Sequence, residues 1–142
     1  KNLFRLKKFY RSVCHPFRLV ADGLYHKKNS KNLIVPLSNL SNELSKYFKN
    51  KNIINYGLRL THRKKISILN DKCLLPYPLI IAYSLAFCFS LKPAKVFLIG
   101  FDGYKLDDTL NDQTQVILNF FKEIGYSKKI IFLSKIKLKN LK

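Results

Sequence analysis

The pattern of apolar and polar residues differs along the chain: some segments have the pattern of a strand and others have the pattern of a helix. Short apolar runs rich in branched residues predict strands over residues 32–37, 52–60, 64–69, 95–101 and 129–133. Helical spacing or a long apolar run predicts helices over residues 1–11, 38–49, about 14 residues of 73–91, and 112–124. Residues 13–21 are expected to form a loop or a strand end, because Pro16 biases His15 away from helical backbone angles.

The order of these elements predicts the fold class. Helix, strand, helix and strand follow one another over residues 77–133, which predicts a parallel sheet with right-handed crossovers. The run 95–101 does not alternate between apolar and polar residues, which is typical of a strand covered on both faces. We therefore expect an α/β fold, a Rossmann-like three-layer sandwich with a mostly parallel sheet, as one domain over residues 1–142. Since the chain does not begin with Met, we expect it to be a fragment of a longer protein.

The uncharged segment Cys73–Leu91 has two interpretations. It is nearly long enough to cross a bilayer as a helix. However, Pro76 and Pro78 stand at its start, where proline suits the first turn of a helix, and Pro93 follows its end. A helix buried on most sides inside an α/β domain explains the same residues, so we predict no transmembrane span.

Charge and cysteine content narrow the range of functions. A formal net charge of +19 would suit a nucleic-acid or anionic-membrane partner. However, only five of the 27 basic residues are Arg, the better residue for bidentate phosphate or base contacts, and Lys is spread along the whole chain. We therefore predict no specific nucleic-acid partner. The three cysteines lie far apart without zinc-ligand spacing, and no signal peptide opens the chain, which together predict reduced thiols and a cytoplasmic location.

The first candidate site follows the strand at 95–101. In open α/β sheets, ligands bind beyond the carboxyl ends of the strands. Gly100 and Gly103 would let the backbone approach a ligand closely, and Asp102 could accept hydrogen bonds from sugar hydroxyls. Tyr104 could stack on a ring or donate to a phosphate. An Asp-Gly turn without a ligand explains Asp102 equally well and explains Tyr104 better.

Further carboxylates follow in the same loop. Asp107, Asp108 and Asp112 are expected to satisfy free N–H groups at the start of the next helix. A divalent cation held by Asp102 and Asp107 is a weaker alternative. We predict no metal or other cofactor.

The second candidate site is the sequence His15-Pro16-Phe17-Arg18. Arg18 could clamp an anionic group, with His15 as a hydrogen-bond donor or general acid. A purely structural loop explains these residues at least as well. His62 stands among Arg and Lys residues and is interpreted as part of a solvated basic turn in preference to an anion-binding face.

Three segments together resemble one bacterial family in their order and spacing: HPFRLVADGLYH (15–26), LIVPLSNL (33–40) and LPYPLIIAYSLAFCFSLKPAKVFLIGFDGYKLDD (75–108). They resemble the C-terminal domain of surface-polysaccharide biosynthesis proteins whose N-terminal half is an aldolase of the HMG-CoA-lyase-like type. That domain is similar in turn to the Rossmann-like motility accessory factor (MptE-like) and sialyltransferase-type group. The resemblance implies that Gly100, Asp102 and Gly103 face a nucleotide or diphosphate ligand.

The residues and the resemblance lead to one functional hypothesis. The chain is expected to bind a nucleotide sugar or another phosphorylated small molecule in bacterial surface-glycan (LPS or capsule) biosynthesis, and to be glycosyltransferase-like if it is an enzyme. The catalytic residues would be His15 and Asp102, and the ligand-binding residues would be Arg18, Gly100, Asp102, Gly103 and Tyr104. The alternative is a non-catalytic accessory module that packs on an aldolase-type partner domain.

Overall fold

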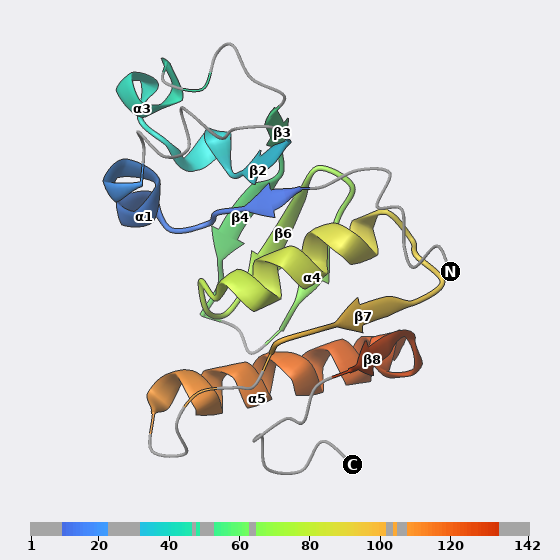
Figure 1. The fold of residues 1–142 in the computed structure, drawn as a ribbon. Coiled ribbons are helices and arrows are strands. Elements are labelled where there is room, and N and C mark those ends of the chain that lie inside the picture. Colours follow the sequence, from blue (N-terminus) through green and yellow to red (C-terminus); the bar gives the residue numbers. More distant parts are fainter. Residues whose placement is uncertain are drawn as a thin grey trace.

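The structure is a mixed α/β arrangement of three small sheets with helices packed beside them (Figure 1). It is a computed structural model that describes residues 10–22, 32–46, 48, 53–62, 65–101, 104 and 108–133. The prediction of an α/β fold is therefore confirmed. The predicted amphipathic helix over residues 1–11 lies mostly outside the described residues.

Most strand pairs are parallel, as the sequence predicts. The first sheet is parallel throughout, in the order β1 (Arg11–Ser12), β2 (Leu33–Val35) and β3 (Ile53–Asn55). In the second sheet the central strand is β6 (Lys72–Leu75), parallel to β4 (Gly57–Leu60) and antiparallel to β5 (Ser67–Ile68). The third sheet is the parallel pair of β7 (Val96–Leu98) and β8 (Ile130–Phe132).

The helices lie between and beside these strands. The α-helices in the described part of the chain are α1 (Pro16–Ala21), α3 (Asn42–Lys46), α4 (Ile80–Ser90) and α5 (Thr109–Phe121). Shorter helical turns are η1 (Leu37–Asn39), η2 (Lys122–Tyr126) and η3 (Ser127–Lys129).

The first two sheets are joined at Tyr56, between β3 and β4. The Tyr56 amide still donates to the carbonyl of Val35 in the first sheet, at 3.1 Å, whereas the Gly57 amide donates to the carbonyl of Asp71 before β6, at 2.8 Å. A Cβ atom on Gly57 would lie 2.9 Å from the Cβ of Lys72, a separation that real Cβ atoms essentially never show. Glycine at this position therefore lets β4 and β6 approach each other where the chain passes between sheets.

The hydrophobic core is centred on α4, which contacts β5, β6 and α5. The residues of α4 that are buried are Ala82, Tyr83, Leu85, Ala86, Phe87 and Phe89. The hydroxyl of Tyr83 donates to the carbonyl of Tyr56 at 2.5 Å, and the Tyr56 hydroxyl donates to Leu69 and Ala86 carbonyls at 3.2 and 3.3 Å. The core therefore contains polar atoms that are paired, as buried polar groups require.

The long uncharged segment divides into two elements. Its start forms β6, which the sequence analysis did not predict, and α4 takes the rest after Pro76 and Pro78. No helix within the described ranges is both long and apolar enough to cross a membrane. This agrees with the interpretation of a buried helix.

Helix α5 begins earlier than the predicted residue 112, because the Asp108 carboxylate accepts a hydrogen bond from the Leu110 amide at 2.8 Å. The capping role predicted for Asp108 is therefore confirmed, and Asp112 lies in the first turn of the helix. Gly125, predicted as the end of this helix, has a φ of +86° inside η2, a conformation that favours glycine.

Two further predictions need correction. Residues 16–21 form helix α1 and not a loop, because Pro16 occupies the first helical turn, where its missing N–H costs nothing. The strand at 95–101 is not covered on both faces: Phe97 is 53% exposed, and Ile99, just beyond β7, is 77% exposed. In Figure 1, β7 is drawn between α4 and α5, and Val96 and Leu98 are the residues of this strand that pack against the core.

Candidate functional site

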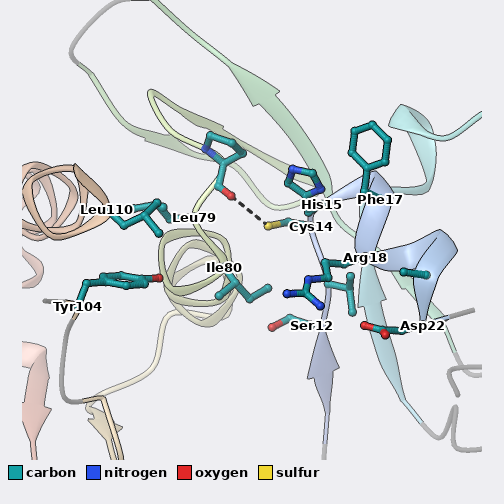
Figure 2. Close-up of a pocket in the computed structure, with 13 residues that line it drawn as sticks. Ser12, Cys14, His15, Phe17, Arg18, Asp22, Leu79, Ile80, Tyr104 and Leu110 are labelled. Carbon is teal, nitrogen blue, oxygen red and sulfur yellow. Dashed lines mark hydrogen bonds between the residues drawn. The ribbon is translucent and has the colours of Figure 1, made fainter. Parts of the chain in front are cut away.

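A pocket of about 720 Å³ lies between the segment of β1 and α1, the start of α4, and the start of α5 (Figure 2). Its volume is within the range of small-molecule sites. Its lining is mainly apolar, with Leu79, Ile80, Tyr104 and Leu110 opposite the polar side chains carried by α1. The pocket can therefore enclose a ligand that has both an apolar and a charged part.

One side of the pocket carries the charged side chains of Arg18 and Asp22 together with His15, and we call this side the charged wall. It is formed by the short helix α1 and the residues at its two ends. His15 is the residue before α1, in an extended conformation (φ −96°, ψ 121°), as the following proline requires. Leu19 is only 2% exposed and anchors α1 in a small cluster with Leu33 and Val35. This anchor leaves Arg18 on the exposed side of the helix, where it lines the pocket.

Two side-chain hydrogen bonds hold the charged wall against α4. The Cys14 thiol donates to the carbonyl of Pro78, with 3.6 Å between sulfur and oxygen (Figure 2). The hydroxyls of Ser12 and Ser84 share a hydrogen bond of 2.6 Å. Residues more than sixty positions apart in the sequence are therefore fixed relative to each other beside the pocket.

Cys14 is a structural group and not a nucleophile. The residue is 5% exposed, and burial raises the pKa of its thiol to about 11. The neutral thiol therefore dominates at neutral pH, and the thiolate is the nucleophilic form of cysteine.

Two charged side chains of the pocket, Arg18 and Asp22, have no ion pair within the described residues. Neither the Arg18 guanidinium nor the Asp22 carboxylate pairs with another side chain of the described residues. The His15 ring contacts the Phe17 ring, with 5.6 Å between their centroids. In Figure 2 the Arg18 guanidinium reaches from α1 toward Ile80. A cation without a protein partner at a pocket is suited to an anionic ligand group.

The start of α4 is a second source of positive electrostatic potential at the pocket, in addition to Arg18. Leu79 is the residue before this 11-residue helix and supplies no side-chain hydrogen bond to its free amides. Pro78, Leu79 and Ile80 all line the pocket. Because the free amides and the helix dipole favour negative charge, this wall also attracts an anion.

The structure brings together three of the residues singled out in the sequence. His15, Arg18 and Tyr104 line this one pocket although the sequence analysis treated them as two sites. Gly100, two residues after the end of β7, has a φ of +69° and does not line the pocket. Asp102 and Gly103 lie outside the described residues, so their assigned roles remain predictions.

Several residues of the pocket were not predicted from the sequence. Asp22 could have been found from its spacing: it follows Arg18 by four residues, which places both on one face of a helix. Predicting a loop over residues 13–21 hid this relation. Leu110 and Ile80 carried no separate signal, because apolar residues at a helix start also suit a core. His62 is exposed and does not line the pocket, as expected of a solvated turn.

Comparison with protein-family models, with curated proteins and with solved structures finds no match for this chain. The resemblance to aldolase-linked polysaccharide proteins therefore stays a prediction.

Proposed function

We propose that this chain is a Rossmann-like domain that binds a phosphorylated small molecule, such as a nucleotide sugar, in the pocket between α1 and α4. The observation that carries the proposal is the free guanidinium of Arg18 facing the uncapped start of α4 across one cavity. Two independent sources of positive potential at one pocket favour a phosphate over a neutral ligand.

Each part of the pocket has a role in this proposal. Arg18 holds the phosphate, and His15 donates a hydrogen bond to it or protonates the leaving oxygen if the domain is a transferase. Tyr104 and Leu110 contact the base or the sugar ring on the apolar side. Asp102, which follows β7 in the sequence, is the residue we assign to orienting sugar hydroxyls. The setting we propose is cytoplasmic bacterial surface-glycan biosynthesis, with a glycosyltransferase-like reaction if the domain is catalytic.

Isothermal titration calorimetry with CMP-, UDP- and GDP-sugars and with simple sugar phosphates tests this proposal. We expect at least one of them to bind, and we expect Arg18→Gln to weaken binding at least tenfold, because a charge-assisted hydrogen bond is lost. Arg59→Gln is the matched control, since Arg59 is an exposed arginine of β4 outside the pocket. Absence of binding across the panel, or equal effects of the two variants, would refute the proposal.

A second candidate function is the non-catalytic module that packs on an aldolase-type partner domain. It is favoured by the exposed apolar side chains beside the third sheet: Phe97, Ile99 and Leu133 are 53%, 77% and 59% exposed. Such residues are typical of a surface that is covered in a larger assembly. If this function is right, Phe97→Lys prevents association with an aldolase-type domain from the same gene locus in sedimentation velocity, while Arg18→Gln does not.

A further inference from the structure

Asp22 gives the pocket a carboxylate that the binding of a phosphate alone does not explain. It lies at the C-terminal end of α1, one helical turn after Arg18, and both side chains line the pocket. Asp22 is the one carboxylate among the described residues that line it. In a chain with 27 basic and 8 acidic residues, a carboxylate beside the anion-binding arginine calls for a specific explanation.

The two side chains do not neutralise each other. Residues four apart on a helix lie close enough for an ion pair, yet no such pair joins Arg18 and Asp22 in the described structure. In Figure 2 the guanidinium of Arg18 is directed from α1 toward Ile80, and the carboxylate of Asp22 lies at the far end of the same helix. The wall thus presents a positive and a negative group separately to the cavity.

This arrangement discriminates between classes of phosphorylated ligand. A ligand that carries only negative charge is attracted by Arg18 and repelled by Asp22, and the repulsion partly cancels the attraction. A ligand that also carries a protonated amine can place this amine at Asp22, so that both charges of the wall are paired. A cavity of about 720 Å³ has room for a molecule that spans both groups.

We propose that the ligand of this pocket is zwitterionic: a phosphorylated molecule with a free protonated amine, such as an amino-sugar phosphate. This inference rests on the proposed function, because it takes Arg18 as the phosphate-binding residue. Arg18 binds the phosphate, and Asp22 binds the ammonium group and thereby selects the aminated ligand over its hydroxyl and N-acetyl counterparts.

Calorimetric titration with three matched probes tests the inference on the full chain. The probes are glucosamine 6-phosphate, glucose 6-phosphate and N-acetylglucosamine 6-phosphate, which share the phosphate and differ at the amine position. We expect the first to bind about fivefold tighter than the other two, from one partly exposed ion pair. Asp22→Asn should abolish this preference by weakening only the aminated probe, and Asp22→Glu should retain most of it. Arg18→Gln should weaken all three.

The possible results separate this inference from the proposed function. Equal affinity for the three probes, or a preference that survives in Asp22→Asn, overturns the zwitterionic ligand and leaves the phosphate site intact. No binding of any probe or nucleotide sugar overturns both. Circular dichroism of Asp22→Asn verifies that the fold is retained, and a partly exposed, nearly isosteric replacement is expected to retain it.

Discussion

The hydrogen bond between Tyr83 and the backbone of Tyr56 offers the sharpest test of the core. Tyr83 lies in α4, is 0% exposed, and donates its hydroxyl to the Tyr56 carbonyl at 2.5 Å. Tyr56 is the residue at which the chain passes from the first sheet to the second. The bond therefore ties the central helix to the junction of two sheets, and Tyr83→Phe removes it with little change in volume.

The magnitude follows from the burial of both atoms. Removing one partner of a buried hydrogen bond leaves the other atom without compensation, which costs about 1–3 kcal/mol. The loss of apolar contact is small because the ring remains, so we expect the free energy of unfolding to fall by about 2 kcal/mol. For a chain of this length, that corresponds to a decrease of roughly 5–7 °C in the melting temperature.

Urea unfolding followed by far-UV circular dichroism measures this change, with thermal unfolding as a second observable. The matched control is Tyr77→Phe, because Tyr77 is half-buried against the same core and its hydroxyl bonds to no other described residue. The control is expected to change stability by less than about 0.5 kcal/mol. If Tyr83→Phe is as stable as the control, the hydrogen bond between Tyr83 and Tyr56 does not stabilise the packing of α4 on the sheets.

Three further predictions concern backbone approach, helix capping and thiol burial. Gly57→Ala should destabilise the fold by about 1–3 kcal/mol in urea unfolding, because its Cβ would meet the Cβ of Lys72 at 2.9 Å; unchanged stability would contradict the close approach of β4 and β6. Asp108→Ala should cost about 1 kcal/mol and Asp108→Asn should recover most of it, since the side chain caps α5; equal losses in both variants would exclude capping. Burial raises the pKa of the thiols of Cys14 to about 11 and Cys73 to about 12, so the folded state keeps protons that the unfolded state loses near pH 8.5. The contribution of these thiols to the free energy of unfolding should therefore be fully present below about pH 8 and should fall as the pH rises from 8.5 toward 11. Urea midpoints measured over a series of pH values test this, and Cys14→Ala should make the decrease with pH smaller. The same decrease in Cys14→Ala as in the unmodified chain would contradict a raised pKa for Cys14.

The elements that the sequence predicted well are those with a strong local pattern. The strand predicted over residues 32–37 contains β2, and the helix predicted over residues 112–124 matches α5 to within a few residues. In both, the spacing of the apolar positions matches the period of the element that the chain forms.

The elements that were not predicted correctly from the sequence, α1 and β6, depend on contacts with residues that are distant in the sequence. Helix α1 has only one buried residue, Leu19, so its sequence shows no helical spacing of apolar positions. Strand β6 was hidden because its apolar residues merge with those of α4. Long-range contacts stabilise both elements. Strand β6 pairs with β4 and β5, and Leu19 of α1 packs in one cluster with Leu33 and Val35.

The pocket depends on the same long-range contacts, which explains why His15 and Arg18 were predicted from the sequence whereas Asp22, Ile80 and Leu110 were not. His15 and Arg18 are recognisable by chemistry alone, whereas their meeting with Tyr104 requires that β1 be held against α4. The bonds from Cys14 to Pro78 and between Ser12 and Ser84 supply that constraint. The first joins this segment to the residues just before α4 and the second joins it to α4 itself, so α1 and the start of α4 stay at a fixed separation. A site preorganised in this way loses little entropy when it binds an anion, and its affinity should therefore depend on these neutral contacts as well as on Arg18.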